Sequence, residues 1–262
     1  MNALEVARDA ARAGGAVLMG YFGQRMELIA KDPTASYNLV SRADLEAEQA
    51  IVRVIRDAFP RHAVLGEESH QGDIHAEHLW IVDPLDGTNN FVHAVPHFAV
   101  SVAYYCQGQA VHGIIFNPAR GDWYEVSDDQ GASYNQNPVS VAPNSQLEEV
   151  LVGVGFYYDR GAMMEATLSA IGDLFRRHIH GIRRFGTASL DLVAVGTGAY
   201  GAFFELELSP WDFAAGRLFV EAAGGRITTC RGQQLPIAKT SVLASNGLLH
   251  DSMLELLAPH VD

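Results

Sequence analysis

The sequence predicts an α/β fold, with α+β character in the N-terminal half and an alternation of strands and helices in the C-terminal half. Three observations support this prediction. Apolar residues recur with a helical period in residues 2–22. Short apolar segments separated by Gly and Asn turns continue to about residue 141. Beyond Pro143, strand-like and helix-like segments alternate, which is typical of a sheet covered by helices.

The expected elements fall into two domains that meet near residue 140. Residues 1–140 are expected to hold helices over 2–22 and 44–59, a polar loop around 31–36, and strands over 64–65, 79–82, 99–105 and from 113. Pro60 ends the second of these helices. Residues 141–262 are expected to hold strands over 150–154, 182–185, 201–206 and 226–229, and helices over 162–178, 189–195 and 213–223.

Composition and charge limit the class of protein. The 262 residues are 48% hydrophobic and 19% charged, as in ordinary globular proteins. The formal net charge of −13 disfavours nucleic acid as a direct ligand, because that needs a basic surface. Only two cysteines occur, which indicates a reducing compartment without a disulfide framework. The sequence shows no signal peptide and no apolar run near the roughly 18 residues of a membrane span, so a cytoplasmic location is expected.

Two acidic segments, far apart in the sequence, carry the predicted chemistry. Residues 80–91 (WIVDPLDGTNNF) end an apolar strand with two carboxylates and then offer Gly-Thr, where a helix could begin. Residues 209–216 (SPWDFAAG) place Asp212 between a Trp and a helix start, and Glu67 in GEES (66–69) adds a further carboxylate. Asp83 and Asp86 flank Pro84, whose ring fixes the backbone, so both carboxylates could face one cavity.

These oxygen ligands favour magnesium or manganese over zinc, because the same segments supply neither a thiolate nor a His. Two such ions could bind a phosphate, lower the pKa of a water and stabilise the leaving oxygen. Thr88 stands where the free amides of a helix N-terminus can hold a phosphate oxygen. Each segment alone could be an ordinary turn or a solvated acidic pair. Jointly they predict magnesium-dependent hydrolysis of a phosphate ester.

Taken together, these segments resemble the inositol monophosphatase family, part of the lithium-sensitive, metal-dependent sugar phosphatase superfamily. The matching residues are 66–69 (GEES), 83–91 (DPLDGTNNF) and 211–216 (WDFAAG), followed by 221–225 (EAAGG). The resemblance covers essentially the whole chain. It implies a layered αβαβα sandwich of the inositol monophosphatase/fructose bisphosphatase type, and a homodimer.

The resemblance also implies a role for each matching residue. The implied metal ligands are Glu67, Asp83, the carbonyl of Leu85, Asp86 and Asp212, for two to three Mg²⁺ ions that Mn²⁺ could replace. The implied catalytic residues are Asp44, Glu67 and Thr88, and Asp44 with Thr88 would orient and deprotonate the attacking water. The implied mechanism is direct in-line attack by metal-activated water, without a phosphoenzyme. Lys31 lies near a loop lysine of the family.

The alcohol part of the substrate depends on other residues. Residues 186–189 (GTAS) resemble the family's substrate loop, and Glu205 falls where inositol monophosphatases bind ring hydroxyls with a Glu. The alternative for Glu205 is a half-exposed strand residue, and Glu207 would share its face. The implied substrate-binding residues are Gly87, Thr88, Gly186, Thr187, Ala188, Glu205 and Asp212. The expected substrate is a small phosphorylated polyol, most simply myo-inositol 1-phosphate.

Other functions are less well supported. Histidinol-phosphate phosphatases share nearly all these segments. Nucleoside 3′,5′-bisphosphatases and fructose bisphosphatases need a basic cluster for a second phosphate, for which only Arg183 and Arg184 stand out. A binding role in RNA-related complexes could coexist with catalysis. Residues 196–201 (GTGAYG) match the dinucleotide fingerprint, but a helix is expected before them and a strand after them, the reverse of what a nicotinamide-binding oxidoreductase requires.

Overall fold

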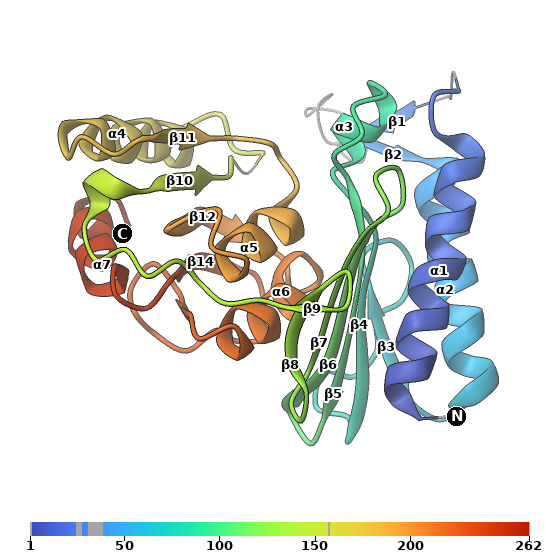
Figure 1. Cartoon of the computed structure of the whole chain (residues 1–262). Coiled ribbons are helices and arrows are strands. Elements are labelled where there is room, and N and C mark those ends of the chain that lie inside the picture. The colour runs from blue at the N-terminus through green and yellow to red at the C-terminus, as the bar shows by residue number, and fades with distance from the viewer. Residues whose placement is uncertain (1, 25–27, 31–38, 157, 262) are drawn as a thin grey trace.

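The computed structural model describes residues 2–24, 28–30, 39–156 and 158–261. Its elements lie in five layers, αβαβα, as Figure 1 shows. Helices α1 (Ala3–Tyr21) and α2 (Arg42–Ala58) form one outer layer, and α4 (Ala162–Arg176) and α7 (His250–Leu257) form the other. Between the two sheets lie α5 (Ala188–Gly196) and α6 (Pro210–Ala222). The predicted α/β class and layered sandwich are confirmed. The loop expected around 31–36 and Lys31 lie outside the described residues.

The first sheet has seven strands in sequence order, and all its neighbours pair antiparallel except β3 and β4, which are parallel. Its strands are β3 (Ala63–Gly66), β4 (His78–Asp86), β5 (Ala99–Cys106), β6 (Gln109–Asn117), β7 (Asp122–Ser127), β8 (Gly131–Tyr134) and β9 (Asn137–Pro138). The short strands β1 (Leu28–Ala30) and β2 (Leu39–Ser41) pair separately, and the short helix α3 (Thr88–Val92) follows β4.

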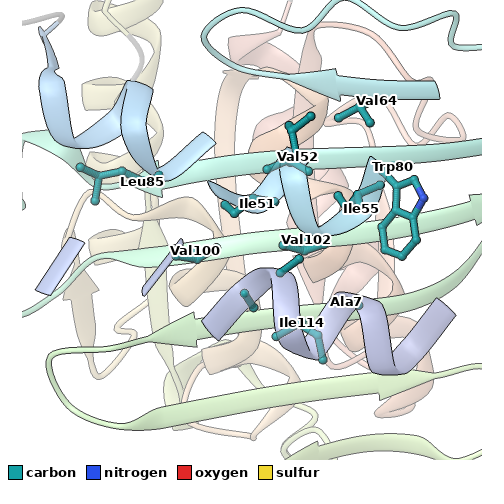
Figure 2. Close-up of a cluster of buried hydrophobic side chains, with 14 of the residues drawn as sticks. Ala7, Ile51, Val52, Ile55, Val64, Trp80, Leu85, Val100, Val102 and Ile114 are labelled. Atoms are coloured by element: carbon teal, nitrogen blue, oxygen red, sulfur yellow. The ribbon is translucent and has the colours of Figure 1, made fainter. Parts of the chain in front are cut away.

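The first core lies between this sheet and the helices α1 and α2. Both helices begin with a capping box, in which Asn2 pairs with Glu5 and Ser41 with Asp44. Their apolar faces pack on strands β4, β5 and β6. Figure 2 shows Ile51 and Ile55 of α2 near Trp80, Val100 and Val102, and Ala7 of α1 near Ile114. Through this packing, α2 lies against β4.

The second sheet has the order β11-β10-β12-β14-β13, so β14 lies between two strands that precede it in the sequence. Its strands are β10 (Leu151–Val154), β11 (Gly181–Arg183), β12 (Ala202–Leu208), β13 (Arg226–Thr228) and β14 (Thr240–Ser245), with 3₁₀ turns at Leu147–Glu149 and Ala258–His260. Helix α6 packs on both sheets. We propose residues 1–140 and 141–262 as the two domains.

Several elements start earlier than the sequence analysis expected. Helix α6 begins at Pro210 rather than at residue 213, because Ser209 caps it and proline is well suited to the first helical position. Helix α2 begins at Arg42 rather than at residue 44, because Ser41 is its N-cap. Strand β14 and helix α7 were not anticipated. Within the described part of the chain, no helix combines the length and the apolar character that crossing a bilayer requires.

Candidate active site

A cavity of about 300 Å³ opens where the end of β4 meets β12 and the starts of α3, α5 and α6. Most of the residues singled out from the sequence line it: Glu67, Asp83, Leu85, Asp86, Gly87, Thr88, Gly186, Ala188, Glu205 and Asp212. Asp44 and Thr187 are the two exceptions, and both are fully buried behind the lining. Segments from both sheets and from the middle helices therefore form one site.

Asp83 and Asp86 reach the same cavity because β4 contains one extra residue. In a regular strand, residues three apart point to opposite faces. Here Asp83 pairs with Ser101 and Asp86 with Ala99, so three steps along β4 match two steps along β5. This irregularity lies at Pro84 and Leu85, and both carboxylates line the cavity. The irregular segment is followed by Gly87, which has a φ of +93° and is the N-cap of α3.

Asp83 is the most enclosed of the five carboxylates that line the cavity. It is 1% exposed, and one of its oxygens accepts a hydrogen bond of 2.9 Å from the amide of Leu85. Burial raises its pKa well above the ordinary value, and the neighbouring carboxylates of Glu67, Asp86 and Asp212 raise it further. Without a compensating cation, the protein thus disfavours the ionised form of this group.

Asp86 closes the N-terminus of helix α5. Its carboxylate accepts the amide of Ser189 at 2.7 Å and the hydroxyl of Ser189 at 2.5 Å. Burial raises the pKa of Asp86 to about 6, although these hydrogen bonds oppose the shift. These hydrogen bonds connect the end of β4 to the loop at residues 186–189.

Asp212 enters the cavity from the first turn of α6. It completes a capping box with Ser209, whose amide donates to the Asp212 carboxylate at 2.7 Å. Burial raises the pKa of Asp212 well above its ordinary value, and the negative charges of Asp86 and Glu67 raise it further. The cap fixes the direction of the carboxylate from the helix side.

Thr88 and Asp44 are joined as the sequence analysis expected. The Thr88 hydroxyl lies 3.1 Å from a carboxylate oxygen of Asp44 and 3.2 Å from the carbonyl of Leu85. The second oxygen of Asp44 accepts the amide of Ser41 at 2.8 Å and its hydroxyl at 2.6 Å. The hydroxyl of Thr88 can donate to only one acceptor at a time, and its lone pairs remain for a ligand in the cavity.

Glu205 lines the same cavity from β12. It is 7% exposed, so the alternative of a half-exposed strand residue does not apply. Its carboxylate lies against the backbone of Gly155, where a Cβ would overlap it. Burial raises its pKa well above the ordinary value, and the nearby Asp191 adds to the shift, whereas Arg184 opposes it. Glu207 forms an ion pair of 3.1 Å with Lys239 instead.

The loop at residues 186–189 is held from behind. Asn90 donates to the carbonyls of His97 at 2.8 Å and Phe185 at 2.7 Å. Thr187 donates to the same His97 carbonyl at 2.9 Å and does not line the cavity. Its side chain therefore supports the loop, while Gly186 and Ala188 form its exposed surface toward the cavity.

The donor set fits a divalent cation. The cavity is lined by five carboxylates and two cationic side chains, Arg184 and Lys239, an excess of three formal negative charges. A phosphate monoester would be repelled from such a cavity unless cations were bound there. Among the described residues, no three His, Cys, Asp or Glu side chains already converge as an ion site. The fit therefore rests on the chemistry of the oxygens, which suits Mg²⁺ or Mn²⁺.

Ser189 and Asn90 lie within segments that the sequence singled out, but neither was given a role of its own there. Ser189 and Asn90 act through hydrogen bonds to residues about a hundred positions away in the chain, as the separations of 103 and 95 positions show. Such contacts leave no local pattern in the sequence. The remaining lining residues that were not singled out as site residues are Asn89, Gly155, Phe156, Tyr158, Leu208, Ser209, Trp211 and Lys239.

Known proteins resemble the chain over nearly its whole length. The pattern described as the inositol monophosphatase family matches residues 2–262. The Nus factor SuhB of Pseudomonas aeruginosa is 37% identical over 98% of this chain and 96% of its own length. The inositol-1-monophosphatase of Caulobacter vibrioides is 38% identical over 97% of this chain and 98% of its own length. The crystal structure of extragenic suppressor protein suhB from Bartonella henselae has a TM-score of 0.89 at 34% identity, with 97% of each chain covered.

Proposed function

Because the chain belongs to the inositol monophosphatase family and is a phosphoric monoester hydrolase, we propose that its reaction depends on magnesium and that its preferred substrate is a myo-inositol monophosphate. One observation carries the proposal. The carboxylates of Glu67, Asp83 and Asp212 line the same cavity as Thr88 and Glu205. The cavity thus combines oxygen ligands for cations with a buried acceptor for an alcohol.

The proposed metal ligands are the carboxylates of Glu67, Asp83, Asp86 and Asp212 and the carbonyl of Leu85. Magnesium bound by these groups would neutralise the phosphate and lower the pKa of a water molecule. The raised pKa values of Asp83 and Asp212 support this assignment. Burial and the repulsion between neighbouring carboxylates disfavour their ionised forms, and a bound cation would stabilise those forms. We propose two to three ions, with Mn²⁺ as a substitute.

Thr88 and Asp44 would orient the attacking water. With the Thr88 proton directed toward Asp44, the hydroxyl oxygen can accept a hydrogen bond from a water in the cavity. As the water loses a proton to the Thr88 hydroxyl, Asp44 would accept the proton that Thr88 gives up. Gly87 and Thr88 would receive the phosphate. We propose direct in-line attack by this water, without a phosphoenzyme, as the family resemblance implies.

Glu205 would bind the polyol. The Glu205 carboxylate is buried, and its pKa is raised by burial and by Asp191 while Arg184 opposes the shift, so it should gain from neighbouring hydroxyl donors, which a cyclitol supplies in pairs. Gly186 and Ala188 would leave room for the ring beside it. The choice of alcohol therefore lies on β12 and the 186–189 loop rather than in the metal ligands.

A panel of substrates tests the assignment. We expect phosphate release with Mg²⁺ to be fastest from myo-inositol 1-phosphate among this compound, histidinol phosphate, fructose 1,6-bisphosphate and adenosine 3′,5′-bisphosphate. A preference for histidinol phosphate would overturn the substrate and leave the chemistry standing. A preference for a bisphosphate would point to Arg184, which lines the cavity, as the binder of a second phosphate.

A second candidate role comes from the name of the Pseudomonas relative. That protein is a Nus factor, and a corresponding non-catalytic role for this chain would not need hydrolysis. An inactive Asp83→Asn variant that still supports the cell would favour it.

Lithium sensitivity, a homodimer and a cytoplasmic location complete the proposal and are each open to direct measurement.

A further inference from the structure

A second buried carboxylate on α2, Glu48, lies under the loop that carries Glu67. Glu48 is fully buried, and its side chain does not line the cavity. One of its oxygens accepts the amide of Glu68 at 2.8 Å. The other accepts the amide of Ser69 at 2.9 Å and its hydroxyl at 2.5 Å, and it lies 2.8 Å from Nδ1 of His70. Four polar groups of one short loop therefore converge on one carboxylate.

The loop has two functional faces. Glu67 lines the cavity, while the next three residues turn their donors to Glu48. The backbone closes around this contact, because the amide of Gly66 donates to the carbonyl of His70 at 2.7 Å. A Cβ on Gly66 would overlap the Glu48 carboxylate, so glycine permits the close approach. The direction of Glu67 thus depends on what holds the residues that follow it.

Asp44 and Glu48 are four positions apart on α2 and share one face of the helix. Asp44 contacts Thr88 at 3.1 Å, and Glu48 contacts the 67–70 loop. One rigid helix therefore sets the spacing between two sides of the cavity. The helix itself is fixed to the sheet by Ile51 and Ile55, which are fully buried.

We propose that Glu48 is a positioning residue of the active site, and that its grip on the 67–70 loop sets the affinity of the cavity for its metal ion. The inference rests on the proposed role of Glu67 as a metal ligand. Groups that orient a metal ligand without touching the ion change metal affinity about 10- to 100-fold when they are removed.

Glu48→Gln is the main test. The amide keeps the size of the side chain but turns an NH₂ donor toward at least one N–H donor of the loop. We expect the Mn²⁺ dissociation constant, measured from the free-ion electron paramagnetic resonance signal, to rise by about 10-fold or more. The magnesium concentration for half-maximal activity should rise in parallel, with activity largely restored at saturating magnesium. A purely structural role would lower the melting temperature without moving either metal constant.

Two further variants make the test decisive. Ser69→Ala keeps Glu48 and both loop amides and should weaken Mn²⁺ binding about 5-fold, the effect of one hydrogen bond. It gives the answer if Glu48→Gln does not fold. Glu46→Gln, which removes a half-exposed carboxylate paired with Arg42 on the same helix, should leave the constant unchanged. If Glu48→Gln and Ser69→Ala bind Mn²⁺ like the wild type, the inference is wrong and the metal site stands. If the wild type binds no Mn²⁺, both the role of Glu48 and the proposed metal site are wrong.

Discussion

Glu205 and Gly155 are in close contact in the part of the cavity that we propose binds the substrate. The carboxylate of Glu205 occupies the space that a Cβ on residue 155 would need. The charges of Asp191 and Asp86 repel the Glu205 carboxylate, and the charge of Arg184 attracts it. The position of this acceptor therefore depends on a glycine in the loop after β10.

Glu205→Gln should weaken substrate binding more than turnover. The amide has one acceptor oxygen in place of two and carries no charge, so a pair of ring hydroxyls loses a charge-assisted contact. We expect KM for myo-inositol 1-phosphate to rise about 10-fold, with kcat changed less than about 3-fold. Steady-state kinetics at saturating magnesium measure both. An unchanged KM would remove Glu205 from the substrate site.

Gly155→Ala should reproduce this effect from the other side of the contact. The added methyl group would displace the Glu205 carboxylate, so KM should again rise several-fold while the metal requirement stays the same. Gly172→Ala is the matched control, because a Cβ at this half-buried position of α4 meets only the side chain of Arg176, at 3.5 Å. Equal KM values for the two alanine variants would contradict the proposed coupling.

Among the elements, α7 is joined to the second sheet by a buried histidine at its first position. His250 is fully buried, and its ring nitrogens lie 2.9 Å from the hydroxyls of Thr228 on β13 and Ser245 on β14. Burial lowers the pKa of His250 to about 4, and the charge of Arg226 adds to the shift. The neutral ring is therefore part of the folded state.

This histidine should make the protein less stable in mild acid. Its pKa is lower in the folded chain than in the unfolded one, so its contribution is complete above about pH 6.5 and is lost as the pH falls toward 4. We expect the loss to be on the order of 2 kcal/mol in the free energy of unfolding. Urea titrations at several pH values measure it. His250→Asn should be less stable at pH 7 but depend less on pH in this window, whereas the exposed His75→Asn should follow the wild type.

For the whole molecule, the sequence predicted the layers and the acidic residues better than it predicted their contacts. The family segments identified Asp83, Asp86 and Asp212, and the structure brings all three to one cavity. The shared direction of Asp83 and Asp86 was predicted from Pro84 alone, and the extra residue in β4 that produces it was not anticipated. The pairing with β5 that creates it is a long-range property.

Other features could not follow from local patterns. Helix α5 begins on the carboxylate of Asp86, a contact between distant parts of the chain. Strand β14 inserts between β12 and β13, although it follows both in the sequence. Periodicity reports which face of an element is apolar, but it does not report which element covers that face. The site is completed by α6, which packs on both sheets and carries Asp212.

The measurement that tests the central claim most directly is phosphate release from myo-inositol 1-phosphate during a magnesium titration. The wild type should be inactive without the ion and saturate as it is added. Asp83→Asn should be slower by about 1,000-fold or more at every magnesium concentration, because the cavity loses a charged ligand of the ion that would neutralise the phosphate and activate the water. Asp57→Asn, on the exposed side of α2, should match the wild type. Near-wild-type hydrolysis by Asp83→Asn at saturating magnesium would contradict the proposed metal site.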